Sequence, residues 1–180
     1  ELARRAGMAK ANVYRYYESR EAVLLALMWS EWERVDGALR VKLSELPGPV
    51  TPRALAALLS AQLAGAPLLC ALIAALPSVL EQNLSAETIG QLKHGILISF
   101  FATGEAMHGA CPAIPAEGHA RLLNDACAVV AGLHPFAHPT PVAEAVMCAP
   151  ELAPLRRDFA ADLQRFLIAL AIQAADDGAS

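Results

Sequence analysis

The chain has 180 residues, enough for one globular body with a small appended module but hardly for two full domains. Hydrophobic residues make up 56% of it and aromatic residues 6%, so Ala, Leu and Val build the core and favour an all-α fold. The net charge of −4 argues against a nucleic-acid partner. The charge is unevenly placed, however: residues 1–20 have a net charge of +3 and the remaining residues a net charge of −7. This asymmetry is expected when one end of a molecule meets phosphate.

The N-terminal residues predict two short helices joined by a tight turn. The first spans residues 2–6 and ends at Gly7, which takes a turn conformation readily; the second spans residues 10–16. Small Ala3 and Ala6 allow the two helices to approach closely, as in a helix-turn-helix. Because the sequence starts within a helical pattern, we expect native residues upstream of Glu1.

Capping residues and prolines predict the helices that follow. A long helix begins near residue 20 and ends near residue 43; shorter helices cover residues 54–65 and 67–83, the second of these bent or divided. A further long helix begins after Ser85 and is ended by Pro112 and Pro115. The residues that set these boundaries are Ser19, the segment 47–49 (Pro-Gly-Pro), Thr51, Pro52, Pro67, Pro77, Ser85, Pro112 and Pro115.

Two more helices close the predicted fold. Apolar residues at helical spacing indicate helices over residues 119–133 and 152–175. Between them, residues 134–151 contain several prolines, which predict a long, irregular connection. These prolines are Pro135, Pro139, Pro141 and Pro150.

Several classes of protein fit the sequence poorly. Residues 54–80 carry no charge over 27 positions, but Pro67 and Pro77 divide this stretch, so we expect core helices and no membrane protein. No nucleophile elbow, phosphate loop or zinc-protease motif indicates an enzyme. His108 and Cys111 have metal-ligand spacing, but Pro112 and the lack of a second close pair lead us to predict no metal and no cofactor. The irregular cysteine spacing favours reduced thiols in the cytoplasm.

Residues 6–24, AGMAKANVYRYYESREAVL, closely resemble the TetR family of bacterial transcriptional regulators. The family's pattern in this region is A-G-[VM], four residues, [LV]-Y-x-[HYF]-F and then [SN]-[KR]. Tyr17 stands where Phe is usual, and Arg20 where Lys is usual. The resemblance implies a partial helix-turn-helix DNA-binding domain over residues 1–20, which lacks the first helix of the family, and a helical-bundle body for effector binding and dimerisation over residues 21–180. It implies a repressor that a small molecule releases from a palindromic operator.

The resemblance also implies roles for individual residues of the second short helix. Lys10 and Ala11 match positions that reach base edges, and Asn12 reads an adenine edge or binds phosphate. Tyr14 and Tyr16 match phosphate-contacting aromatic residues, and Arg20 matches a phosphate-binding cation. The alternative for the charged residues is a solvated surface, and for the tyrosines it is packing.

The family's body implies a cavity for a small hydrophobic effector, and the apolar excess of this chain is compatible with one. Each candidate lining residue is also compatible with ordinary core packing; a buried histidine usually has a carbonyl or hydroxyl partner and no ligand role. The candidates are Trp29, Trp32, Leu63, Cys70, His94, Phe100, Phe101 and His108.

The last two predicted helices resemble the pair that forms a four-helix bundle across a two-fold axis in this family, which implies a homodimer. The alternative is that their apolar stripes serve the chain's own core. The candidate interface residues are Leu122, Val129, Leu133, Phe159, Leu163, Phe166 and Leu170. A competing hypothesis for the whole chain is a helical module that binds a ligand or protein without binding DNA.

Overall fold

The computed structural model of the chain describes residues 19–178, and this part is entirely helical, with seven α-helices and no strand. The predicted short helices over residues 2–6 and 10–16 lie outside the described residues. The all-α prediction is confirmed for the part described. The helices are α3 (Arg20–Ser44), α4 (Pro52–Ala64), α5 (Pro67–Ala75), α6 (Ala86–Ala110), α7 (Ala116–Ala137), α8 (Pro141–Met147) and α9 (Phe159–Gly178).

Hydroxyl caps begin four of these helices, and the sequence predicts those of α3, α4 and α6; Thr140 caps α8. The side chain of Ser19 accepts a hydrogen bond from the Ala22 N–H at 3.1 Å, at the start of α3. Thr51 caps α4, directly before Pro52, and Ser85 caps α6. Each cap satisfies a backbone N–H that has no partner inside the helix, which fixes where the helix starts.

The predicted break near Pro77 is confirmed. After α5, one turn of π-helix covers Leu76–Leu80, and a 3₁₀ turn covers Glu81–Asn83. Proline has no N–H to donate and its ring crowds the preceding turn, so the regular α-helical hydrogen bonds cannot continue through Pro77.

The C-terminal boundaries differ from the predicted ones. Helix α7 does not end at Leu133 but continues through Pro135, which is exposed in the last turn; the His138 N–H still reaches the His134 carbonyl at 2.9 Å. The predicted irregular connection contains α8 and a 3₁₀ helix, Pro150–Leu155. Helix α9 begins at Phe159 and not at residue 152, because Pro154 interrupts the helix and the Asp158 carboxylate caps the new start by accepting from the Ala161 N–H at 3.0 Å.

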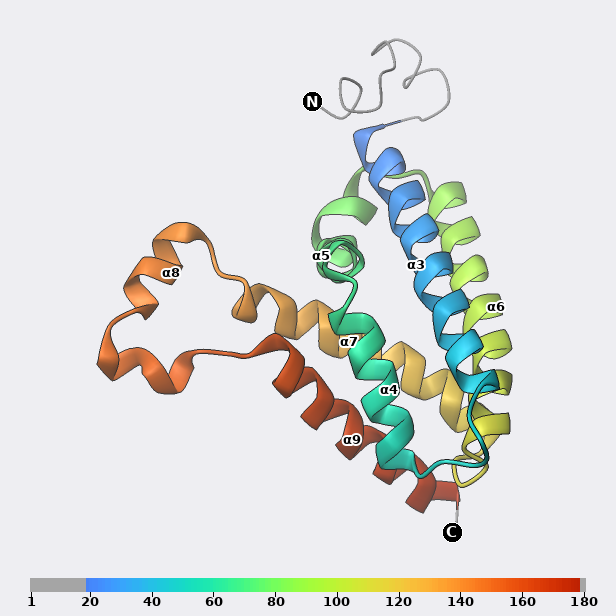
Figure 1. Cartoon of the computed structure of the whole chain (residues 1–180). Helices are drawn as coiled ribbons and strands as arrows, with labels where there is room; N and C mark the ends of the chain where they lie inside the picture. The colour runs from blue at the N-terminus through green and yellow to red at the C-terminus, as the bar shows by residue number, and fades with distance from the viewer. Residues whose placement is uncertain (1–18, 179–180) are drawn as a thin grey trace.

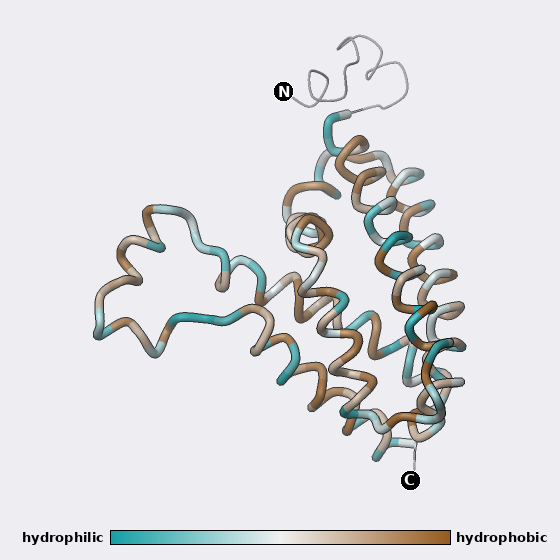
Figure 2. The backbone as a smooth tube through the Cα atoms, viewed as in Figure 1, coloured by the Kyte–Doolittle hydropathy of each residue, from teal (hydrophilic) through white to brown (hydrophobic). Residues whose placement is uncertain are grey.

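The helices form a packed body from which residues between α7 and α9 project (Figure 1). Helices α3 and α6 run alongside each other, while α9 packs on α4 and α7, and α7 also packs on α5 and α6. Hydrophobic positions recur along α3, α4 and α9 (Figure 2). Fully buried side chains at the centre include Leu55, Leu63, Leu69, Met107, Leu123, Leu163 and Leu167.

No single helix within residues 19–178 is long and apolar enough to cross a membrane. The uncharged stretch noted in the sequence forms two helical segments, Pro52–Ala64 and Pro67–Leu80, which pass the length and composition test only together and are bent by 86° relative to each other.

His119, at the start of α7, is fully buried and is partnered on one side only. Its Nε2–H donates to the Cys111 carbonyl at 3.1 Å, and within the described residues its Nδ1 has no hydrogen-bond partner. Burial lowers the pKa of His119, and the neighbouring His108 lowers it further, against an opposing effect of the Cys111 carbonyl. The ring is therefore a neutral donor that holds the start of α7 to the end of α6.

We expect this histidine to make the protein less stable in mild acid. The unfolded chain takes up the proton as pH falls through about 6.5, whereas folded His119, with its lowered pKa, does not, so the free energy of unfolding decreases below that pH. His119→Gln keeps an N–H for the Cys111 carbonyl and removes the titration. Urea unfolding at pH 7.5 and 5.5 should show a smaller pH dependence for the variant than for the wild type; the remainder comes partly from His134, whose pKa is lowered by burial and by His138. An unchanged pH dependence in the variant contradicts this account.

Candidate functional site

A cavity of about 170 Å³ lies in the body beside α3. Four helices contribute to it: α3, α5, α6 and α7, together with the π-helical turn after α5. Its volume lies below the ~300–1,000 Å³ of most ligand sites, so only a molecule of one or two rings suits it. The lining residues are Met28, Trp29, Trp32, Leu69, Ile73, Leu76, Lys93, Ile96, Phe100, Asn124 and Cys127.

The walls of the cavity are mainly aromatic and aliphatic. The indole N–H of Trp32 donates to Ser99 Oγ at 2.7 Å, and that of Trp29 donates to Glu33 Oε1 at 3.0 Å. The Trp32 and Phe100 rings lie 5.3 Å apart in a tilted arrangement. Since both indole donors are already satisfied, the two tryptophans offer a ligand apolar surface and no free hydrogen-bond donor.

Among the polar side chains that line the cavity, the one charged group is neutralised by an ion pair. Lys93 forms an ion pair with Glu81 at 2.5 Å. Burial raises the pKa of the Cys127 thiol, with a further contribution from Cys70, so the thiol stays protonated at neutral pH. Asn124 is the remaining polar group. The cavity therefore suits a neutral, largely apolar molecule better than an ion.

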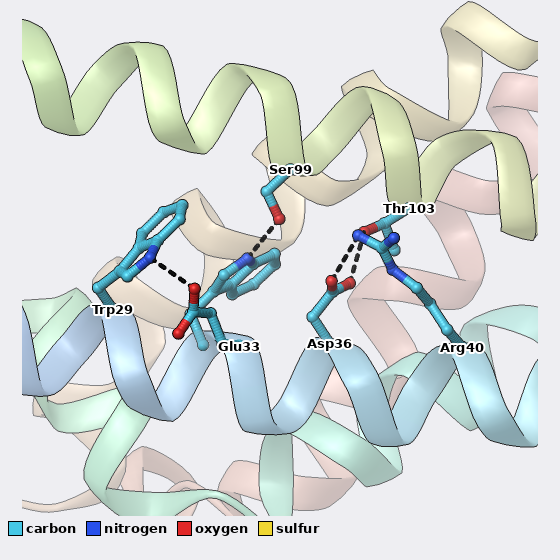
Figure 3. Close-up of polar contacts among 7 residues, drawn as sticks. Trp29, Glu33, Asp36, Arg40, Ser99 and Thr103 are labelled. Carbon is cyan, nitrogen blue, oxygen red and sulfur yellow. Dashed lines mark hydrogen bonds and ion pairs between the residues drawn. The ribbon is translucent and has the colours of Figure 1, made fainter.

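A polar seam joins α3 to α6 one helical turn after the cavity residue Trp32 (Figure 3). Buried Asp36 on α3 forms an ion pair with Arg40 at 2.6 Å and accepts a hydrogen bond from the Thr103 hydroxyl on α6. Arg40 Nη2 also donates to Thr103 Oγ1 at 2.9 Å. A buried carboxylate is costly unless it is paired and hydrogen-bonded, so this arrangement fixes how α3 lies on α6. With Trp32 and Ser99, it gives α3 two polar attachments to the same helix.

The sequence was compared with known protein families. The family model described as "Bacterial regulatory proteins, tetR family" matches residues 1–27, and the model described as "Tetracyclin repressor-like, C-terminal domain" matches residues 30–172. The second match alone covers most of the chain.

The chain belongs to the TetR family.

The comparison with curated proteins finds no match.

Membership of the TetR family makes this chain a DNA-binding transcriptional regulator and not an enzyme. The matched N-terminal region contains the predicted DNA contacts Lys10, Ala11, Asn12, Tyr14 and Tyr16, which lie outside the described residues. Arg20 is described: it is the first residue of α3 and is exposed to solvent.

Three of the predicted cavity residues line the cavity of this TetR-family body: Trp29, Trp32 and Phe100. Leu63 and Cys70 are buried but lie outside its lining. His94 and Phe101 are exposed on α6, because the inward face of that helix is formed by Leu92, Phe100 and Met107.

His108, the last predicted cavity residue, is half-buried near the end of α6, away from the lining. Its Nδ1–H donates to the Ile114 carbonyl at 2.9 Å. This bond holds the loop after α6, a structural role that a partly buried histidine commonly has. No group of three or more His, Cys, Asp or Glu side chains within residues 19–178 is arranged to hold a metal ion.

The predicted interface residues divide into two groups. Leu122, Leu133 and Leu163 are buried in the chain's own core, because α4 and α5 cover the inner faces of α7 and α9. The other four keep exposed surface on these helices. They are Val129, Phe159 and Leu170, which are partly buried, and Phe166, which is 37% exposed.

Sequence reasoning missed the polar seam and most of the cavity lining. Asp36 was the available signal, because it interrupts the apolar stripe of α3 one residue after Val35. Met28 lies on the same stripe, but nothing in the spacing distinguishes a core residue that borders a cavity from one that packs tightly. Lys93 and Asn124 carry no local signal of a cavity at all.

Proposed function

We propose that this TetR-family regulator is a homodimeric repressor that leaves a palindromic operator when a small, neutral, apolar effector occupies the cavity beside α3. The observation that carries the proposal is that α3 supplies Met28, Trp29 and Trp32 to the cavity and begins at Arg20, the last residue of the predicted DNA-binding region. The same helix thus touches the ligand site and follows the segment that reads DNA.

The packing supports a mechanical link. Trp29 lies about 14 Å along α3 from Arg20, so a small tilt of α3 at the cavity is carried rigidly to its first turn. At Gly95 on α6, an added Cβ would lie 3.2 Å from the Trp29 ring, so α6 leaves that ring little room to yield. A ligand larger than the empty cavity therefore pushes α3 away from its neighbours, against the polar seam at Asp36 and Arg40.

We further propose that dimerisation uses the outer faces of α7 and α9 and that residues 1–20 and 21–180 form the DNA-binding and effector domains. The exposed surface that Val129 and Phe166 retain on these helices supports this interface. A two-fold axis presents two identical DNA-binding regions, and an operator with inverted repeats matches that symmetry. A regulator of this kind acts in the cytoplasm, where it meets its DNA.

Filling the cavity should abolish the response to apolar compounds. Ile96→Phe places a larger side chain into the lining, whereas Leu97→Phe adds the same ring at a position that is 52% exposed on the same helix. A ligand at a hundred times its dissociation constant stabilises the folded state by about 2.7 kcal/mol, which raises Tm by about 5–10 °C for a chain of this size.

We would measure Tm with indole, naphthalene and toluene as probes, and operator binding with and without a compound that raises Tm. We expect the wild type and Leu97→Phe to respond alike, and Ile96→Phe to lose both the Tm shift and the release from DNA while still binding DNA. Equal responses in both variants would place the effector elsewhere in the molecule.

A further inference from the structure

The cavity beside α3 has an apolar floor and a polar mouth. Lys93 on α6 and Asn124 on α7 line it and are exposed, so they lie where the cavity opens to solvent. The buried part of the lining is aromatic and aliphatic throughout. Its residues are Met28, Trp32, Leu69, Ile73 and Phe100. A bound molecule therefore has one end against an apolar floor and the other end beside two polar side chains.

The two polar side chains at the mouth offer hydrogen bonds but no net charge. Within residues 19–178 the Asn124 amide forms no hydrogen bond, so its oxygen and its N–H groups are available to a ligand. The charge of Lys93 is compensated by Glu81, while an ammonium has three N–H groups and a single ion pair does not use them all. The mouth thus presents an acceptor and donors side by side.

The remaining groups of the lining add little hydrogen-bonding capacity. The indole N–H of Trp29 is taken by Glu33, and that of Trp32 is taken by Ser99. Cys127 contributes a thiol, which is a weak donor and a weak acceptor. Asn124 is therefore the residue of the lining that is best able to recognise a polar group on a ligand.

The floor favours a flat ring over a branched chain. The Trp32 and Phe100 rings lie 5.3 Å apart in a tilted arrangement, and the Trp29 ring is backed by Gly95 on α6. Aromatic rings pack well against one another in offset or edge-to-face arrangements, which a planar ligand can extend. With a volume of about 170 Å³, the cavity has room for one or two such rings.

We propose that the ligand of this cavity is a neutral phenol of one or two rings, whose ring packs against Trp32 and Phe100 and whose hydroxyl bonds to the Asn124 amide. A hydroxyl both donates and accepts, so it can donate to Asn124 Oδ1 and accept from the Lys93 ammonium. An anion is disfavoured, because Glu81 already compensates Lys93 and the floor cannot solvate a charge. This inference rests on the cavity of the proposed function and adds the chemical class of its ligand, with Asn124 as the specificity-determining residue.

Two probes of nearly equal shape test the role of the hydroxyl. 4-Methylphenol and p-xylene differ only in that a methyl group replaces the hydroxyl. Asn124→Leu removes the amide with little change of volume at an exposed position of α7. Gln164→Leu is the matched control, because Gln164 is an exposed amide on α9 outside the cavity lining. Isothermal titration calorimetry with the full-length protein gives the dissociation constants, and equal Tm values without ligand show that the variants are folded.

We expect the wild type and Gln164→Leu to bind 4-methylphenol more tightly than p-xylene. Asn124→Leu should weaken the binding of 4-methylphenol about 3- to 10-fold, the effect of one typical hydrogen bond, and leave the binding of p-xylene unchanged. 4-Methylbenzoate has a carboxylate in place of the hydroxyl, and it should bind the wild type about tenfold more weakly than 4-methylphenol, or weaker still.

Each contrary result identifies what is wrong. If p-xylene binds as tightly as 4-methylphenol and Asn124→Leu changes neither, the phenol is overturned and the apolar effector of the proposed function stands. Tighter binding of 4-methylbenzoate also overturns the phenol, because the site would then recognise an anion. If 4-methylphenol binds through Asn124 but does not release the operator, the ligand class stands and the control of DNA binding by the cavity is wrong. Binding of none of the three probes overturns both.

Discussion

Leu163→Ala should lower the free energy of unfolding by about 2–5 kcal/mol. Leu163 is fully buried, and α9 packs there against α4 and α7. Truncation removes methyl groups from a close-packed core and leaves a cavity that rigid helices on both sides can only partly close. Because Leu163 packs within its own chain, the decrease in the free energy of unfolding should be the same at low and at high protein concentration.

Ile172→Ala is the matched control, because Ile172 is 40% exposed on the same helix. We expect Ile172→Ala to lower the free energy of unfolding much less than Leu163→Ala does, since a partly exposed side chain loses little buried area when truncated. Urea unfolding of both variants at two protein concentrations measures the difference. If Leu163→Ala costs no more than Ile172→Ala but weakens the dimer, Leu163 is an interface residue, as its position in the sequence first suggested.

Lys10→Ala should weaken operator binding by about 1–3 kcal/mol, or about 5- to 150-fold, because the resemblance places this side chain at a base edge. Its effect should depend on the base that it contacts. Tyr14→Ala should weaken binding to every duplex to a similar degree, since the tyrosine is expected to contact phosphate. Neither change should alter Tm much.

Fluorescence anisotropy with the operator and with single-base variants of it measures both effects. Arg34→Ala is a suitable control, because Arg34 is an exposed residue of α3 that pairs only with Glu31 among the described groups. If Lys10→Ala and Tyr14→Ala both bind like the wild type, the DNA-binding region has been assigned to the wrong residues.

Local signals predicted the starts of α3, α4 and α6 well. Ser19, Thr51 and Ser85 each accept a bond from a backbone N–H at the start of a helix, and this chemistry involves only residues three positions apart. Pro77 acts as locally, since its ring and missing N–H disturb its own turn. The family could be recognised because the motif between Ala6 and Leu24 is dense and short.

The tertiary arrangement could not be predicted in the same way. Helical spacing shows that Leu163 and Phe166 are on an apolar stripe, but only the position of α4 decides that Leu163 is covered and Phe166 is not. The same limit applies to α6, where Phe100 faces the cavity and Phe101 faces solvent.

The helical structure between α7 and α9 was missed for a different reason. Four prolines between residues 134 and 151 predict an irregular connection, yet Pro141 and Pro150 begin helical turns, where a missing N–H costs nothing. Arg156 holds this segment together by donating hydrogen bonds to carbonyls seven to nine residues earlier, a contact that no short-range pattern encodes.

The central claim is that the protein reads a palindromic operator and that the cavity beside α3 controls this reading. Selection of duplexes from a random pool by the full-length protein, repeated with a compound that raises Tm, tests it most directly. We predict that the selected sites are inverted repeats, that binding weakens steeply with salt, and that the compound releases them from the wild type but not from Ile96→Phe. Enrichment of no sequence, or release that is equal in Ile96→Phe, would contradict the account.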